Sequence, residues 1–379
     1  MADNLIEYIR HIYNTNDFIP LHKPSFKEID TQYVQNTMES GFVSSVGEYV
    51  DEFEDSLKRY TGCGKAVATV NGTAAIQAAL YVSGIKSGDI VLTQALTFVA
   101  SCNVLKHMGL TPAFIDVSFK TLGMCPKALE LFLDENATLD VHGCAIYANT
   151  GQRIHSVMPM HTFGHPVELD EIQRVCKKWN LLLIEDSAES LGSYYKGQHT
   201  GTFGDYGILS FNGNKIITTG GGGAVLCQSE ALGKRLRHVT STAKVPHPYE
   251  YYHDEAGFNF RMPNLNAALG CSQMLSLGEF LNKKRELAGM YRRYFEPTEY
   301  EFFMEPDHAK SNYWLNAVIC PNKKSRDELL EKTNKKGVMT RPVWTLMHKL
   351  PAFKQAIYSD LSNSEKLEEL LVNIPSTPI

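Results

Sequence analysis

Between residues 66 and 228, short runs of apolar residues alternate with stretches in which apolar side chains recur every three or four positions. The short runs are typical of strands buried on both faces, and the periodic stretches are typical of amphipathic helices. This alternation predicts a mostly parallel sheet covered by helices. Seven strands are expected, at residues 66–70, 90–93, 113–117, 157–161, 181–185, 206–211 and 224–228. The helices between them are expected at residues 73–82, 98–107, 126–134 and 169–180.

The two ends of the chain show other patterns. Apolar residues at helical spacing predict a short helix over residues 4–13, and Pro20 and Pro24 keep the following segment extended. Beyond residue 258, the pattern predicts a long helix with Asn264 at its cap, then a strand and two further helices. These elements are expected at residues 264–294, 313–319, 325–333 and 363–371.

A chain of 379 residues is long enough for one large domain and one smaller domain. The change of pattern near residue 258 marks the boundary between them. We therefore expect an N-terminal helix and arm at residues 1–25, a large domain at 26–257 and a small α+β domain at 258–379.

The overall charge and the apolar stretches exclude two classes of partner. A net charge of −5 argues against a nucleic-acid partner held by a basic surface. No stretch of about 20 apolar residues occurs, and the N-terminus lacks the basic and apolar regions of a signal peptide. We expect a cytoplasmic protein that does not insert into a membrane.

The first candidate motif lies where the strand at residues 66–70 leads into a helix. Gly72 permits a tight turn, and Thr73 places a hydroxyl group and an N–H group at the start of the helix. A helix N-terminus in this position suits a phosphate group. An ordinary strand-to-helix turn would have the same residues, so both interpretations stand at this point.

The second motif is a pair of carboxylates, Glu185 and Asp186, which follow four aliphatic residues of another predicted strand. Ligands of open α/β sheets collect at the carboxyl ends of the strands. A carboxylate there keeps a pyridinium nitrogen protonated, and the protonated ring is then an electron sink. The alternative is that Asp186 only caps a helix.

The third motif is Lys215, which follows a further apolar strand and precedes four consecutive glycines at residues 220–223. Glycines allow the backbone to approach a ligand closely, and a lysine in a polar, cation-rich site can form a Schiff base. The loop is no Walker loop, because the pattern GxxxxGK[ST] is absent. A surface turn with a solvated lysine is the alternative, although it gives the four glycines no evident purpose.

A metal site is not expected. His161 and His165 have the spacing of metal ligands on a helix, but Gly164 and Pro166 disfavour a helix there. No cluster of cysteines or carboxylates completes a site around them.

In chain order, these motifs resemble those of the DegT/DnrJ/EryC1/StrS sugar aminotransferases, which are fold type I enzymes dependent on pyridoxal 5′-phosphate. The resemblance extends over nearly the whole chain, from Pro20 to Pro375. It implies a mostly parallel seven-stranded sheet between helices and a smaller C-terminal α+β domain. The matching motifs are NGTAA at 71–75, TFVA at 97–100, HTFGHP at 161–166, EDSAE at 185–189, Ser210 with Lys215, and GFNFRM at 257–262.

The resemblance implies roles for the residues around the cofactor ring. Lys215 would bind the cofactor as a Schiff base and move a proton between the substrate carbon and the cofactor. Asp186 would pair with the ring nitrogen. Phe98 would stack on the ring, with a place in the core as the alternative. Glu189 stands where other members often have a histidine, so a cofactor contact and a water network both remain open for it.

The resemblance also implies a phosphate site and a subunit arrangement. Gly72, Thr73 and Ser210 would hold the cofactor phosphate. Asn259 would reach it across the interface of a homodimer, so that each active site is shared by two subunits.

Within the family, the helical N-terminal extension and residues 41–47 and 121–124 are most similar to the branch that aminates C4 of UDP-linked 4-keto-6-deoxy-N-acetylhexosamines. L-glutamate would donate the amino group in a ping-pong reaction, and the product would serve surface glycan biosynthesis. Arg341, Trp344 and His348 would bind substrate, with a structural role in the small domain as the alternative.

Three other functions remain open. The substrate could be a dTDP- or GDP-linked keto sugar aminated at C3 or C4. The chain could be a sugar dehydratase on the same scaffold, although the dehydratases of this group replace the lysine by histidine. A non-catalytic protein that binds sugar nucleotides is the third alternative.

Overall fold

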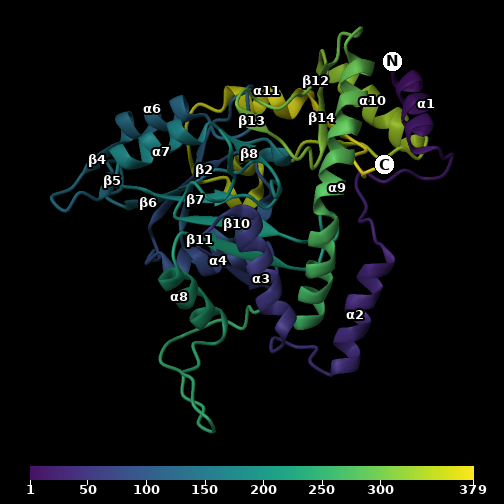
Figure 1. The fold of residues 1–379 in the computed structure, drawn as a ribbon. Coiled ribbons are helices and arrows are strands. Elements are labelled where there is room, and N and C mark those ends of the chain that lie inside the picture. Colours follow the sequence, from purple (N-terminus) through teal and green to yellow (C-terminus); the bar gives the residue numbers. More distant parts are fainter.

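The computed structural model describes residues 1–379 and contains a ten-stranded sheet with helices on both faces (Figure 1). Its main path runs β1 (Lys65–Thr69), β11 (Gly223–Cys227), β10 (Tyr206–Ser210), β7 (Leu182–Asp186), β6 (Arg153–Met158), β2 (Ile90–Gln94), β3 (Thr111–Ile115) and β16 (Ile357–Tyr358). Neighbours on this path pair in parallel, except that β11 is antiparallel to β1 and β10. A hairpin of β4 (Ala137–Leu139) and β5 (Ala145–Tyr147) extends from β6. The first seven strands correspond to the seven predicted from the sequence, except that β6 lies several residues earlier than expected.

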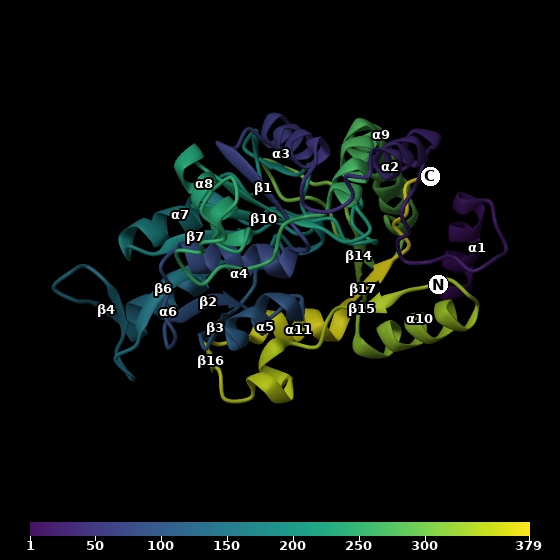
Figure 2. The ribbon, with the colours of Figure 1, turned by 90° about the horizontal axis from the view of Figure 1, so that it is seen from below.

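Helices cover both faces of this sheet, because alternate side chains of each buried strand point to opposite sides. One face, with Val67 and Ile184, packs against α4 (Gly72–Val82), α5 (Val99–His107) and α8 (Glu230–Thr240). The other face, with Leu183, packs against α6 (Pro126–Asn136) and α7 (Leu169–Lys178). On that same side, Ala66 packs against α3 (Glu48–Thr61) and α9 (Asn264–Phe295). Figure 2 shows the helices on either side of the strands.

A second, antiparallel sheet lies beside the first, in the order β12 (Glu301–Phe302), β14 (Asn316–Ile319), β17 (Leu371–Ile374) and β15 (Arg341–Pro342). It packs against α1 (Ala2–Tyr13), α10 (Lys323–Lys335) and the end of α9. Leu5 and Ile9 of α1 are fully buried there, as their helical spacing predicts. A third sheet joins β13 (Ala309–Lys310) to the hairpin of β8 (Tyr194–Tyr195) and β9 (Gln198–His199). No helix is both long and apolar enough to cross a membrane.

The large sheet with its helices forms a large lobe, and the second sheet with its helices forms a small lobe. More than one segment connects these two lobes. α9 runs along both of them, and α11 (Ser362–Leu370) packs with residues of the large sheet through Leu367. β16 leaves the C-terminal region and pairs with β3 of the large sheet. The two lobes share several elements, so the domain boundaries expected at residues 25 and 257 stay a proposal.

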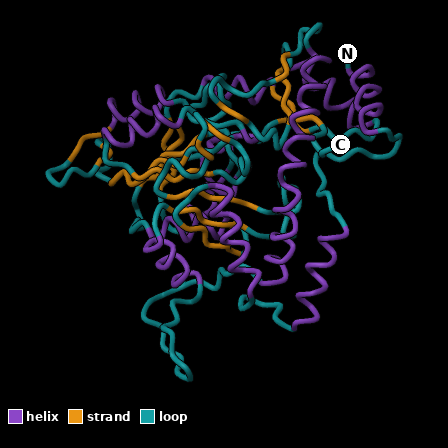
Figure 3. The backbone as a smooth tube through the Cα atoms, in the orientation of Figure 1, coloured by secondary structure: helices purple, strands orange, loops and turns teal.

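Some elements differ from the sequence expectation. The strand expected at 157–161 spans Arg153–Met158 instead; an isolated bridge then pairs Met160 with Asp186, and a 3₁₀ turn follows at Thr162–Gly164. Asn264 begins α9 without capping it: its side chain donates to the Phe42 carbonyl at 2.6 Å and accepts from the Tyr49 N–H at 3.1 Å. α2 (Glu28–Ser40) is not predicted, since it buries only Asp30 and Thr37 and has no apolar stripe. Figure 3 shows how much of the remaining chain is loop.

Candidate active site

The turn between β1 and α4 forms one side of the site. The Asn71 side chain caps α4 by accepting a hydrogen bond from the Ala74 N–H at 2.8 Å. A β-carbon on Gly72 would stand only 3.1 Å from the β-carbon of Ser210 at the end of β10. Thr73 is exposed beside them. First-turn N–H groups lack partners within the helix and attract anions, so Gly72, Thr73 and Ser210 form a cradle suited to a phosphate group.

The glycine run after Lys215 packs behind this cradle. A β-carbon on Gly223, the first residue of β11, would stand 2.4 Å from the Asn71 carbonyl carbon and 2.5 Å from the Gly72 nitrogen. Gly220 has a φ of 79°, which favours glycine. Gly223 is therefore required for β11 to pass directly behind the turn.

Asp186 is the last residue of β7 and is only 3% exposed. One of its oxygens accepts a hydrogen bond from Ser101 Oγ at 2.5 Å, and the other accepts one from the Ala188 N–H at 3.2 Å. No helix begins after Asp186, so the helix-cap interpretation is wrong. A buried carboxylate with only neutral donors is stabilised by a cation, which a protonated ring nitrogen supplies.

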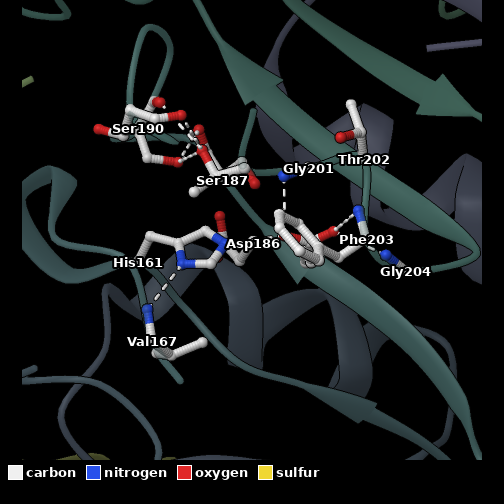
Figure 4. A network of polar contacts seen from close by, with 12 residues as sticks. His161, Val167, Asp186, Ser187, Ser190, Gly201, Thr202, Phe203 and Gly204 are labelled. Carbon is white, nitrogen blue, oxygen red and sulfur yellow. Dashed lines mark hydrogen bonds and ion pairs between the residues drawn. The ribbon is translucent and has the colours of Figure 1, made fainter. Parts of the chain in front are cut away.

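Glu185 precedes Asp186 and points to the opposite face of β7. Its carboxylate lies 3.1 Å from His161 Nε2, and the other ring nitrogen of His161 accepts from the Val167 N–H. Three backbone N–H groups also donate to it at 2.7 Å, those of Gly201, Phe203 and Gly204. Figure 4 shows this network, with His161 on one side and residues 201–204 on the other. Glu185 thus links His161 to the loop at residues 201–204, and the His161 side chain is occupied by this contact.

Lys215 lies in the loop after β10, where its ammonium group contacts two other segments. Nζ is 3.4 Å from Glu189 Oε1 and 3.9 Å from the centre of the Trp314 ring. The Trp314 indole N–H donates to the carbonyl of Asn214 at 2.7 Å, which fixes the ring beside the lysine. Only 13% of the Lys215 side chain is exposed, so the surface-turn interpretation is wrong.

Glu189 lies in the turn after β7 and is almost fully buried. Its Oε2 accepts a hydrogen bond from the Phe163 N–H at 2.9 Å. Burial raises the pKa of Glu189 to about 7, although the Lys215 ammonium and the Phe163 N–H act in the opposite direction; Asp186 raises it further. This carboxyl group therefore changes its charge near neutral pH.

This raised pKa predicts a pH-dependent contribution to stability. Between its ordinary value of 4.5 and about 7, the folded protein binds a proton that the unfolded chain releases, so stability from Glu189 is lost as the pH rises through this window. The difference in unfolding free energy between the cofactor-free protein and Glu189→Gln should fall by about 3 kcal/mol across it. Urea titrations at several pH values measure the difference; a constant difference would contradict the prediction.

The aromatic ring of Phe98 is exposed at the edge of the site. Phe98 directly precedes α5 and is 49% exposed, so it is not a core residue. Its ring lies edge-on to Trp344 at 6.2 Å, and Trp344 in turn packs on Phe163 at 5.1 Å. A ring held at one edge with an open face is suited to stacking on a ligand. Trp344, predicted to bind substrate, lies next to it.

The other predicted site residues do not contact Lys215, although the carbonyl of Phe260, next to Asn259, accepts a hydrogen bond from the Val70 N–H beside the cradle. Arg341 is exposed in β15, where it pairs with Asn373 of the small sheet. His348 Nε2 lies 3.7 Å from Glu365 of α11. Asn259 is exposed at the base of the loop between α8 and α9, which projects from the body in Figure 1. One chain alone does not bring these residues to Lys215, and their roles stay proposals.

Three residues of the site were not predicted from the sequence: Ser101, Asn312 and Trp314. Ser101 directly follows the TFVA motif and bonds Asp186 from one turn along α5, so the motif could have been extended to include it. Asn312 and Trp314 come from the small lobe, and no local pattern marks them as neighbours of Lys215.

These side chains fit pyridoxal 5′-phosphate. The cradle at Gly72 and Ser210 suits its phosphate, the buried Asp186 suits its ring nitrogen, and Lys215 supplies the amine for a Schiff base. A model of the DegT/DnrJ/EryC1/StrS aminotransferase family matches residues 24–379. The chain belongs to this family. It is therefore a sugar aminotransferase dependent on pyridoxal phosphate, as the sequence motifs predicted.

Named relatives of this DegT/DnrJ/EryC1/StrS aminotransferase include two GDP-perosamine synthases. That of Escherichia coli O157:H7 is 32% identical over 361 residues, covering 95% of this chain and 94% of the relative. That of Caulobacter vibrioides is 30% identical over 365 residues, covering 94% and 93%. The crystal structure of the aminotransferase TlmJ from Streptoalloteichus hindustanus has a TM-score of 0.84 at 24% identity, with 95% and 93% of the two chains covered. These likenesses confirm the predicted fold class.

Proposed function

We propose that this enzyme transfers the amino group of L-glutamate to the C4 ketone of a nucleotide-linked 4-keto-6-deoxy sugar. The observation that carries the proposal is that the Lys215 amine, the buried Asp186 carboxylate and the phosphate cradle all come from the carboxyl ends of strands of one sheet, β10, β7 and β1. The retained lysine also disfavours the dehydratase alternative. A non-catalytic binding protein would have no use for this arrangement.

Each side chain of the site has a separate role in the proposed reaction. Pyridoxal phosphate, when bound, stabilises negative charge at the carbon that carries the amino group. Lys215 removes and returns the proton at that carbon, and Asp186 keeps a positive charge on the ring nitrogen. Phe98 covers one face of the ring, and Trp344, Arg341 and His348 are proposed to face the sugar nucleotide.

The nucleotide we favour is GDP. The two named relatives are GDP-perosamine synthases, each similar over more than nine tenths of both chains. They support the GDP-linked alternative better than the UDP-linked N-acetylhexosamine expected from residues 41–47 and 121–124. The UDP-linked sugar stays the second candidate on the strength of those two segments and the helical N-terminal extension.

We further propose that the enzyme works as a homodimer in which Asn259 reaches the phosphate cradle of the partner. Phe42, Val46 and Tyr251 are 60%, 65% and 82% exposed, and exposed apolar side chains of this size mark interaction surfaces. Asn259 follows Tyr251 in the same projecting segment. A second copy would cover these side chains and complete the site.

A panel of keto sugars tests the substrate. The enzyme is incubated with glutamate and GDP-, dTDP- or UDP-linked 4-keto-6-deoxy sugars, and products are followed by mass spectrometry. We expect kcat/KM for a GDP-linked sugar to exceed the others by roughly 100-fold, the effect of leaving one buried polar group of the site unpaired with the wrong base. Preference for the UDP-linked sugar would restore the second candidate, and amination of none would refute the reaction.

A further inference from the structure

Three separate segments meet at the ammonium group of Lys215. Glu189 comes from the turn after β7, Trp314 precedes β14, and Lys215 follows β10. The contacts are the 3.4 Å distance to the Glu189 carboxylate and the 3.9 Å distance to the Trp314 ring centre. Asn312 links the two partners, because its side chain donates to the Glu189 carbonyl at 2.9 Å and accepts from the Trp314 N–H at 2.8 Å. The lysine thus sits between a carboxylate and an aromatic face that are fixed relative to each other.

A second buried lysine fixes the backbone of Trp314. Lys284 of α9 is fully buried, and its Nζ donates to the carbonyls of Trp314 at 3.0 Å and Ser376 at 2.5 Å. Burial lowers the pKa of Lys284 well below its usual range. Trp314 is therefore held through its ring by Asn214 and through its backbone by Lys284. A ring held at both ends stays in place whether or not the Lys215 ammonium lies over it.

The other charged and titratable groups nearby do not compete for Lys215. Asp186 accepts hydrogen bonds from Ser101 and Ala188 on its two oxygens. His22, from the N-terminal arm, has both ring nitrogens buried without a partner. Burial lowers the pKa of His22, and Lys284 and Lys215 lower it further, so this ring is neutral. Glu189 is thus the one carboxylate within 4 Å of the Lys215 nitrogen.

We propose that Glu189 and the Trp314 ring form a resting site for the Lys215 ammonium group in the stages of the reaction in which this lysine is not bonded to the cofactor. The proposal rests on the proposed function, in which Lys215 alternates between a bonded and a free state. A carboxylate and an aromatic face both favour a cation, and each is stronger when water is excluded. Glu189 is here a positioning residue.

The titration of Glu189 gives this site a dependence on pH. Because the pKa of Glu189 lies at about 7, its carboxyl group carries little charge below pH 6 and is mostly charged at pH 8. The interaction of Glu189 with the Lys215 ammonium group therefore strengthens as the pH rises through neutrality. The Trp314 ring does not titrate, so its contribution is constant.

The test uses the cofactor-free protein and measures how fast acetic anhydride modifies Lys215, by mass spectrometry of the peptide that contains it. Lys324, whose side chain is 87% exposed, serves as the internal reference. In Glu189→Gln, the amide oxygen still accepts from the Phe163 N–H but carries no charge. We expect the Lys215 rate relative to Lys324 to rise about tenfold over the natural protein at pH 8 and to be unchanged below pH 6.

Trp314→Leu is the matched control and a second, independent test. It should raise the relative rate about threefold, the effect of losing a cation–π contact, and by the same factor at pH 6 and pH 8. An unchanged or slower rate in both variants, or a pH-independent effect of Glu189→Gln, would overturn the proposal. Because no cofactor is present, these outcomes are separate from a failure of the proposed function, which would show as Lys215 never carrying the cofactor.

Discussion

Replacing Lys215 by alanine should abolish covalent attachment of pyridoxal phosphate and lower the rate of sugar amination by about 10⁴-fold. The variant loses both the amine of the Schiff base and the group that moves the proton. Lys284 cannot replace it, because its nitrogen is buried and bonded to two carbonyls. Reduction with borohydride followed by peptide mass spectrometry reports attachment, and the loss of the absorbance band of lysine-bound cofactor reports it independently.

Lys196→Ala is the control for this variant. Lys196 lies on the surface in an ion pair with Asp170, so attachment and turnover should both be unchanged. Labelled cofactor on a different lysine of the Lys215→Ala protein would show that the site is wrongly assigned. Full activity in that variant would contradict the proposed reaction.

Adjacent carboxylates of β7 should respond in opposite ways. Asp186→Asn should lower kcat by about 100-fold or more, since a neutral amide does not hold a proton on the ring nitrogen. The free energy of unfolding should change little, because the aspartate charge is buried without a cationic partner in the chain. Glu185→Gln should instead lower the free energy of unfolding by about 3 kcal/mol, since its charge accepts three backbone hydrogen bonds.

Thermal melts and steady-state kinetics on both variants separate these effects. The spectrum of bound cofactor adds a third measurement, which should change for Asp186→Asn and stay the same for the folded fraction of Glu185→Gln. Loss of stability in Asp186→Asn with normal kcat would reverse the assignment of the two carboxylates.

The sheet could be predicted from the sequence because its strands are buried on both faces and bounded by turns. The pattern also marked the start of a helix at Gly72 and Thr73 after one strand, whereas Ser210, at the end of another, was assigned to the phosphate only through the resemblance to the family. The pattern alone did not distinguish Glu185 from Asp186, and the resemblance assigned the ring nitrogen to Asp186. The distinction depends on which face of β7 each residue occupies, and both faces are buried.

The rest of the site depends on contacts between distant segments. Trp314 reaches Lys215, and Asn312 reaches Glu189, only because the small lobe packs over the turn after β7. Nothing in their local sequence marks them. The proposed contact of Asn259 is with a partner subunit, and the side chains proposed to select the nucleotide, such as Arg341, are exposed in the single chain. Packing between lobes and subunits decides these positions.

The continuous helix α9 has a consequence for how substrates enter. Its 32 residues form a rod about 48 Å long that is packed into the cores of both lobes. A hinge between the lobes would have to bend this rod, and no proline breaks it. The enzyme is therefore built as a rigid frame, and passage of a bulky sugar nucleotide falls to loops such as the one between α8 and α9. Turnover should then be sensitive to changes in loop length and insensitive to stiffening of the frame.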